Sequence, residues 1–169
     1  MDQELEQEFV TLLEGNQNIL HKICRLYTSD LNSHQDLFQE MVIQLWRSFP
    51  KYRGEAKFST WAYRVSLNTA ISMYRGSRKK VTTVSWDNSL ANIRYEEYND
   101  QKDQQLNWLY NAVRQLNDID KALVYLYLED KDYQEISETL GISVINARVK
   151  MNRIKTKLKE MIAKNGVLT

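Results

Sequence analysis

The amino-acid sequence predicts an all-α protein of two small helical domains joined by a flexible linker, with a helix-turn-helix as the C-terminal domain. Apolar residues recur at helical spacing along most of the 169 residues. One proline and five glycines are few helix breakers for a chain of this length. Serine, asparagine or aspartate stands before several apolar runs, as is typical of helix N-termini. We place the domains at residues 1–80 and 106–169 and the linker at 81–105.

The first apolar run covers residues 5–28, and Gly15 divides it. We therefore expect one interrupted helix or two consecutive helices whose apolar stripe belongs to the core. Cys24 is the only cysteine and falls among apolar positions, which excludes an internal disulfide and indicates a small buried side chain. His21 and His34 are the only histidines, so no Cys/His set has metal-ligand spacing, and we expect no metal or other cofactor.

The N-terminus is acidic, and no apolar run approaches the ~20 residues that a membrane-spanning helix needs. These features predict a cytoplasmic protein with no membrane insertion of its own. The sequence also offers no carboxylate pair, nucleophile–base set or phosphate-binding glycine loop, so we do not expect an enzyme.

The next helix starts at Ser33 or Asp36 and ends before Pro50. One face of it is apolar and the opposite face is polar, yet Ile43 falls among the polar residues by helical angle and Trp46 lies at the border. An apolar residue ringed by polar ones fits a protein-contact surface. Single exposed apolar residues are also common, so periodicity alone leaves both interpretations open.

Residues 49–58 contain Pro50 and Gly54 and predict a loop. Ser59 predicts the N-cap of the helix that follows and runs to Arg75. At 100° per residue, apolar side chains cover most of this helix, whereas Arg64, Asn68 and Arg75 share one narrow sector with Trp61 on its flank. Such groups can neutralise phosphate, bind base edges and stack on an unpaired base.

Charge is segregated along the chain although the net charge is only +1. Residues 51–80 carry eight basic side chains, interleaved with aromatic ones, against the single acid Glu55. Residues 148–164 are also basic, whereas 81–105 collect acids and amides and predict an extended linker with one irregular helical turn. This order of basic, acidic and basic segments predicts two DNA-facing modules with a connector of the opposite charge. The alternative is a solvated basic face over an aromatic core, which suits Tyr63 and Tyr74 better.

The sequence of the C-terminal region predicts several consecutive helices, most of them with a capping residue at the start. Residues 106–116 predict an amphipathic helix, and Asn117 or Asp118 caps the next one. Asp132 with Glu135 has capping-box spacing. A short helix, a turn at Gly141 and a long basic helix from Ser143 to about residue 163 form the helix-turn-helix pattern. Its small core is expected from the apolar side chains around the turn, namely Tyr133, Ile136, Leu140, Ile142 and Val144.

Three motifs resemble the bacterial extracytoplasmic-function (ECF) sigma factors. F-S-T-W-x-Y-R-V-x-x-N, closed by a basic cluster, resembles region 2, and Y-x-E-I-S-E-x-L-G-I-S-V resembles region 4. D-L-F-Q-E-x-x-x-x-L-W is similar to the family segment that grips the clamp helices of RNA polymerase's largest subunit. The resemblance covers about residues 5–80 and 106–163.

The resemblance implies an alternative-type sigma factor that binds core RNA polymerase at the clamp helices and flap region, recognises promoter DNA and promotes melting. It implies a polymerase-binding set of Asp36, Gln39, Glu40, Ile43, Trp46 and Arg47. It implies a −10 set, with a loop that captures a flipped base, of Lys51, Tyr52, Arg53, Lys57, Trp61, Arg64, Asn68 and Arg75. It implies a −35 set of Ser143, Asn146, Arg148, Lys150 and Arg153.

The family's linker threads through the polymerase, and an anti-sigma factor is a further expected partner. One departure concerns the start of the last helix. Where relatives often have G-T-V, this chain has Ile145, Asn146 and Ala147, so its preferred bases do not follow from the resemblance.

Two other functions fit part of the sequence. A conventional helix-turn-helix regulator that binds duplex DNA without polymerase explains residues 132–160, but it leaves the aromatic and basic stretch without a role. Such regulators also usually dimerise to read two half-sites. A helical adaptor that binds only protein fails to explain two separate basic stretches.

Overall fold

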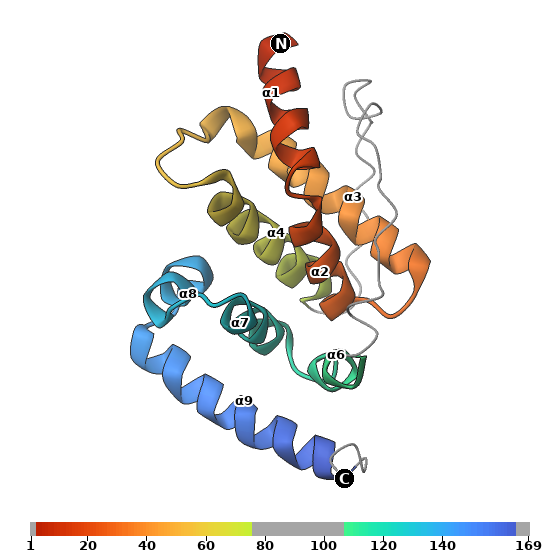
Figure 1. Cartoon of the computed structure of the whole chain (residues 1–169), viewed down its shortest axis with the longest axis vertical. Helices are drawn as coiled ribbons and strands as arrows, with labels where there is room; N and C mark the ends of the chain where they lie inside the picture. The colour runs from red at the N-terminus through yellow and green to blue at the C-terminus, as the bar shows by residue number, and fades with distance from the viewer. Residues whose placement is uncertain (1–2, 76–106, 165–169) are drawn as a thin grey trace. The chain divides into compact units, whose positions relative to one another are not determined.

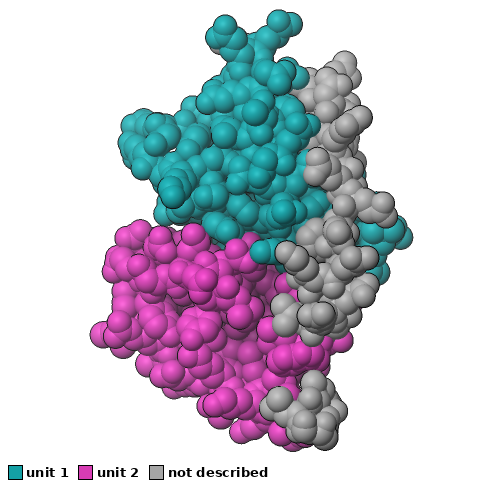
Figure 2. Space-filling view, viewed as in Figure 1, with its two compact units in different colours: residues 1–24, 30–98 teal, residues 25–29, 99–169 magenta. Residues whose placement is uncertain are grey.

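The computed structural model describes residues 3–75 and 107–164 (Figure 1). These residues form eight α-helices and one 3-10 helix and contain no β-strand, which confirms the predicted all-α class. The chain divides into two compact units, one of residues 1–24 and 30–98 and the other of residues 25–29 and 99–169 (Figure 2). The predicted linker 81–105 and the basic cluster 78–80 lie outside the described residues.

The first unit begins with α1 (Gln3–Glu14) and α2 (Gln17–Tyr27). The end of α2, residues 25–27, belongs to the second unit. The break between these helices confirms the prediction of an interruption at Gly15. Gly15 N–H still donates to the Thr11 carbonyl at 3.2 Å, and the Asn16 side-chain amide donates to the Leu12 carbonyl at 2.7 Å. These bonds satisfy the last carbonyls of α1, so the chain can start a second helix within two residues.

The unit continues with α3 (Leu31–Ser48), the 3-10 helix η1 (Phe49–Lys51) and α4 (Phe58–Tyr74). α3 packs directly on α4. Apolar side chains from all four α-helices are fully buried between them: Phe9, Leu13, Leu20, Ile23, Leu37, Met41, Leu45 and Leu67. Each contributes roughly 1.5–3 kcal/mol on burial, so the packing of these helices stabilises the unit. Cys24 is buried, as predicted, and burial raises the pKa of its thiol.

Two predicted helix starts were wrong. α3 is capped by Asp30, which accepts from Ser33 N–H and Ser33 Oγ–H at 2.8 Å each, so Ser33 lies inside the first turn. α4 starts at Phe58 after Lys57, which offers no side-chain cap, and Ser59 is again within the helix. Phe58 is buried against neighbouring aromatic rings, so tertiary packing rather than a capping hydroxyl fixes this start.

The second unit contains α6 (Asn107–Val113), α7 (Asp118–Leu128), α8 (Tyr133–Leu140) and α9 (Val144–Lys164). α7, α8 and α9 pack on one another, and α6 packs on α9. This is the predicted helix-turn-helix, in which α8 precedes the turn and α9 follows it.

The caps of the second unit match the sequence prediction. Asn117 Oδ1 accepts from the N–H of Asp120 at 2.9 Å and starts α7. Asp132 and Glu135 form the capping box of α8, with bonds of 2.8 and 3.3 Å. Gly141 ends α8 with φ +70°, a left-handed conformation that glycine adopts at low cost.

The core of the helix-turn-helix differs from the expected set. Of the five residues predicted to build it, Ile136 is fully buried, and the other four keep part of their surface exposed. The remaining buried surface comes from one stripe of α9, formed by Ala147, Met151, Ile154, Leu158 and Ile162. The core differs from the predicted one because α9 is long enough for its apolar stripe to cover α7 as well as α8.

Candidate nucleic-acid interface

A pocket of about 230 Å³ lies where the 49–57 segment meets the start of α4. It is entirely within the first unit. It is lined by Lys51, Tyr52, Arg53, Glu55, Ala56, Thr60, Trp61 and Arg64. Five of the eight predicted −10 residues thus meet at one cavity, although the sequence separates them by as many as thirteen positions.

The apolar wall of the pocket is aromatic. The rings of Tyr52 and Trp61 lie 5.0 Å apart between centroids, with their planes at 37°. Behind them Phe49 and Phe58 contact Trp61 at 6.1 and 5.4 Å. Tyr52 and Trp61 both keep part of their surface exposed, whereas Phe49 and Phe58 are buried. The two outer rings therefore rest on a fixed apolar base and present surface on which a planar ligand can stack.

The loop that closes the pocket has a defined shape. Tyr52 Oη–H donates to the Ala56 carbonyl at 2.6 Å, so the phenol spans the loop from one side to the other. Gly54 lies between them with φ +72°, and a residue with a side chain would be strained in this conformation. The sequence predicted a loop here but could not show that Tyr52 closes it.

The rim of the pocket is cationic. Lys51, Arg53 and Arg64 are exposed, and Glu55 is the one acid among the lining residues. Cations around an aromatic cavity attract a phosphate backbone and leave the rings to hold a base. The site thus combines the two features that binding of an unpaired nucleotide requires.

Three predicted −10 residues lie outside the pocket. Lys57 is exposed at the N-cap of α4. Asn68 is exposed four residues after Arg64, on the same face of the helix, and Arg75 is the exposed C-cap residue. These side chains extend the polar stripe of α4 beyond the cavity. Sequence reasoning missed Glu55, Ala56 and Thr60, which line the pocket through the loop conformation and carry no distinctive pattern of their own.

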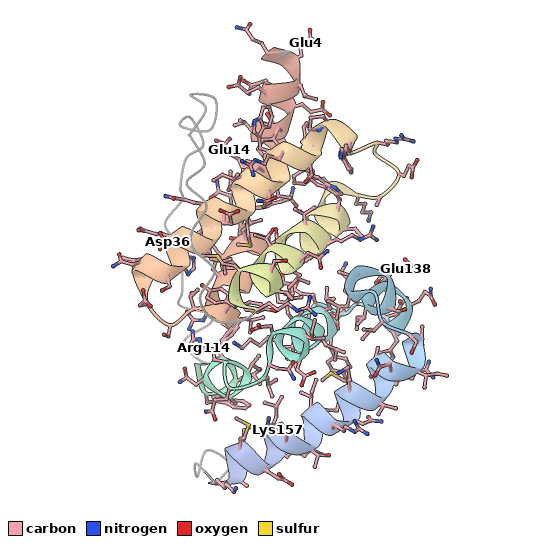
Figure 3. The ribbon with its side chains drawn as sticks, turned by 180° about the vertical axis from the view of Figure 1, so that it is seen from behind. Glu4, Glu14, Asp36, Arg114, Glu138 and Lys157 are labelled. Carbon is pink, nitrogen blue, oxygen red and sulfur yellow. The ribbon has the colours of Figure 1, made fainter. Side chains whose placement is uncertain are left out.

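The predicted polymerase-binding residues divide into two groups. Asp36, Gln39 and Arg47 are exposed on α3 (Asp36 is labelled in Figure 3), and Glu40 is partly exposed, with Oε1 accepting from Gln44 Nε2 at 2.8 Å. Ile43 and Trp46 are buried, with exposed fractions of 7% and 8%.

The expectation that Ile43 is an exposed apolar contact was therefore wrong. The buried side chains of α3 run from Leu37 to Trp46 and cover about 240° of the helix at 100° per residue, wider than a single amphipathic stripe. Trp46 packs its ring 5.0 Å from that of Phe9 on α1. α3 is thus covered from more than one side, and its free surface is narrower than the sequence pattern indicated.

The predicted −35 residues lie on the first half of α9. Asn146, Arg148 and Arg153 are exposed and Lys150 is partly exposed. Ser143 caps the helix, because its Oγ accepts from the backbone N–H of Asn146 at 3.0 Å.

Cations of α9 lie beside aromatic rings of α7 and α8. The guanidinium of Arg148 is 5.4 Å above the ring of Tyr133 on α8. Farther along α9, the ammonium of Lys155 lies 4.5 Å from the ring of Tyr127, and its hydrogen bond with Tyr127 raises the pKa of Lys155. Lys157 is exposed on the same helix (Figure 3).

Two exposed large apolar residues of α9 were not predicted as site residues. Ile145 has 77% of its surface exposed and Val149 has 41%. Their helical angles, opposite the apolar stripe, were the signal that could have identified them.

The described residues contain no group of three or more His, Cys, Asp or Glu side chains placed to hold a metal ion. Among the helices of residues 3–75 and 107–164, none has the length and apolar character to cross a bilayer.

Comparison with known proteins agrees with this arrangement. Residues 12–80 match the family model of Sigma-70 region 2, and residues 106–158 match that of Sigma-70, region 4. The chain is 27% identical over 157 residues to the RNA polymerase sigma factor YlaC of Bacillus subtilis, covering 88% of each protein. It is 23% identical over 168 residues to the ECF RNA polymerase sigma-E factor of Haemophilus influenzae, covering 93% of this chain and 88% of that protein.

The chain belongs to the ECF RNA polymerase sigma factors. Its function is that of an alternative sigma factor in transcription initiation, which confirms the assignment made from the motifs. A solved structure of CnrH, in complex with the cytosolic domain of CnrY, superposes with a TM-score of 0.63 at 16% identity, covering 96% of this chain and 97% of that one. That likeness shows that this chain and CnrH share a fold.

Proposed function

We propose that this sigma factor binds core RNA polymerase through α3, captures an unpaired base of the −10 element in the pocket beside α4, and places α9 in the major groove of the −35 element. Residues 1–80 would serve as region 2, 81–105 as the linker and 106–169 as region 4. The observation that carries the proposal is the cavity where Tyr52, Trp61 and Arg64 meet.

The pocket suits one nucleotide. Its volume of about 230 Å³ lies below the roughly 300–1,000 Å³ of sites for drug-sized ligands. Extruding a base from a duplex costs a few kcal/mol. Stacking on an aromatic ring returns ~1–3 kcal/mol per base, and the cations at the rim add contacts to the backbone. The balance favours a captured base once the duplex begins to open.

The exposed stripe of α4 continues the path of the single strand. Arg64 and Asn68 lie one turn apart on the same face, and Arg75 lies at the end of the helix. The two guanidinium groups can neutralise separate phosphates of the strand, and the amide of Asn68 between them can bind a base edge. Lys57 extends the basic surface at the other end of α4. Binding along this stripe would hold the strand that the pocket has separated.

The −35 element is proposed to bind α9, whose first turns carry Asn146, Arg148, Lys150 and Arg153. In helix-turn-helix proteins the residues near the start of the second helix reach base edges. We assign base contacts to Asn146 and Arg148 and backbone contacts to Lys150 and Arg153. Ser143 contributes by fixing the first turn of the helix.

Core RNA polymerase is proposed to contact region 2 through the exposed polar side chains Asp36, Gln39 and Arg47, with Glu40 at the edge, and to contact region 4 with its flap region. The clamp helices of the largest subunit are the proposed partner of α3. Ile43 and Trp46 would support this face from beneath, since both are buried. Charged rims of this kind direct association and register more than they add affinity.

The remaining assignments follow from the family. We propose that the protein has no catalytic activity of its own, works in the cytoplasm and is held inactive by an anti-sigma factor. The solved complex of CnrH with the cytosolic domain of CnrY supports a protein partner for this fold.

Co-elution with core RNA polymerase, followed by permanganate probing of a promoter, tests the proposal. We expect the chain to co-elute with the core enzyme and unpaired thymines to react only when both are present. Tight sequence-specific binding of duplex DNA by the chain alone, without polymerase association, would instead identify a conventional helix-turn-helix regulator.

A further inference from the structure

Ile145 and Val149 form an exposed apolar pair on the first turns of α9. Their exposed fractions are 77% and 41%, and they lie four residues apart on adjacent turns of one face. At 100° per residue, Val149 is about 180° and Ile145 about 140° from the middle of the buried stripe. The pair thus occupies the part of the helix that points farthest from its own domain.

Cationic and amide side chains surround the pair. Arg148 and Lys150 lie on its two sides, each about 80° from the middle of the buried stripe, and Asn146 and Arg153 border it. Basic residues around an apolar centre fit the geometry of a major groove, where the walls are phosphates and the floor is made of base edges. The same surroundings disfavour an apolar protein partner, because burying these cations against it would leave them without counter-charges.

An exposed branched pair also has a cost in a helix. Isoleucine and valine are weaker helix formers than lysine, glutamate or alanine, and at these exposed positions they gain nothing from the core. Contact with a ligand would explain why isoleucine and valine are present at positions where they do not contribute to folding stability.

We propose that Ile145 and Val149 read thymine methyl groups in the major groove of the −35 element. This inference rests on the proposed function, in which α9 enters that groove. Thymine is the base that presents a methyl group there, and an apolar side chain against this methyl group discriminates it from cytosine. The promoters of this sigma factor would therefore carry thymine at fixed −35 positions beside the base read by Asn146.

Uracil tests the contact, because it differs from thymine only by the absent methyl group and keeps the same pairing. The −35 sequence is first selected from random duplexes by holoenzyme made from core RNA polymerase and the full chain. Each selected thymine is then replaced by uracil, and holoenzyme affinity is measured for wild type, Ile145→Ala and Val149→Ala. Leu128→Ala is the matched control, since Leu128 is an apolar residue with 49% of its surface exposed on α7 and outside α9.

With wild type and Leu128→Ala, we expect uracil at one or two −35 positions to weaken binding about fourfold for each methyl group that loses its apolar contact. With Ile145→Ala or Val149→Ala, thymine and uracil should bind alike at the position that the residue reads. This loss of discrimination separates a methyl contact from a structural role, because a misfolded domain would bind all promoters poorly.

Three results would overturn the inference. If the wild-type holoenzyme selects a −35 sequence but binds uracil and thymine templates equally, the methyl contact does not exist. If the alanine variants instead reduce assembly with core polymerase, the pair belongs to a protein interface. If the wild-type chain forms no promoter complex with core polymerase at all, the proposed function fails, and the inference fails with it.

Discussion

The phenol ring of Tyr52 and the indole ring of Trp61 meet at 5.0 Å across the pocket of region 2, and both remain partly exposed. Tyr52 comes from the end of η1 and Trp61 from the first turn of α4, so the loop conformation creates this pair. Substitution of either residue therefore tests the pocket.

Trp61→Ala should impair promoter melting more than binding to closed duplex DNA. Loss of one stacking surface should cost ~1–3 kcal/mol in the open complex, where the base is unpaired. Permanganate reactivity measures melting, and gel shift with holoenzyme on ice measures closed binding. Tyr74→Phe serves as control, because Tyr74 lies at the far end of α4. An equal loss of both activities, with a lower melting temperature, would show that Trp61 acts only in the core.

Tyr52→Phe should weaken open-complex formation while preserving the stacking ring. The substitution removes the 2.6 Å hydrogen bond to the Ala56 carbonyl, and a neutral hydrogen bond contributes about 0.5–1.5 kcal/mol, less at an exposed site such as this loop. We expect the rate of open-complex formation to fall by about twofold, with unchanged polymerase affinity. An unchanged rate would indicate that the loop keeps its shape without this bond.

Asp30→Ala should destabilise the first unit in a pH-dependent way. Bonds from Ser33 lower the pKa of the Asp30 carboxyl from its ordinary value of 3.8. A carboxyl whose pKa is lowered by folding stabilises the protein at pH values above 3.8, and this contribution is lost as the pH falls through the lowered folded-state pKa. Wild type should therefore melt at a higher temperature than Asp30→Ala at pH 7, and the difference should shrink toward pH 3. Constant separation of the two melting curves across this range would argue against a charged cap.

Arg47→Glu should weaken holoenzyme assembly without unfolding region 2. Arg47 is exposed near the end of α3, so reversal of its charge changes the proposed clamp-binding face but not the core. Competition for core polymerase should show a several-fold loss of affinity that is larger at low salt. Glu8→Lys on α1 provides a charge reversal of comparable exposure outside that face. Equal effects of the two substitutions would remove α3 from the polymerase interface.

The sequence predicted those features of the fold that depend on local interactions. Caps at Asp132 and Ser143 were identified correctly, and Asn117 was one of the two candidates for the third cap, because a capping side chain bonds backbone groups only two or three residues away. The start of α4 was missed because it depends on the packing of Phe58, which no local pattern reveals. Ile43 was expected at the surface, but several elements bury α3 together.

In the candidate site, too, local sequence indicated the residue types, whereas tertiary packing determined which residues meet. The aromatic and basic composition of residues 51–75 indicated which side chains to consider, but not which of them meet. The pocket exists because Tyr52 folds over to the Ala56 carbonyl and Gly54 adopts a left-handed conformation. In α9, the sequence prediction selected charged and polar residues and did not include Ile145 and Val149. Their exposure becomes evident only when the buried stripe of the helix is known.

Arg148→Ala should weaken −35 recognition by about 1–3 kcal/mol if Arg148 binds a guanine through two hydrogen bonds. Its guanidinium already lies 5.4 Å above the ring of Tyr133, which fixes its direction before DNA binds and lowers the entropy lost on contact. Affinities for the selected −35 site and for each single-base variant distinguish a contact with a base from a contact with a phosphate. A loss confined to one base position assigns Arg148 to base reading. A uniform loss across all sequences, with a salt dependence shallower by about one ion, assigns it to a phosphate instead.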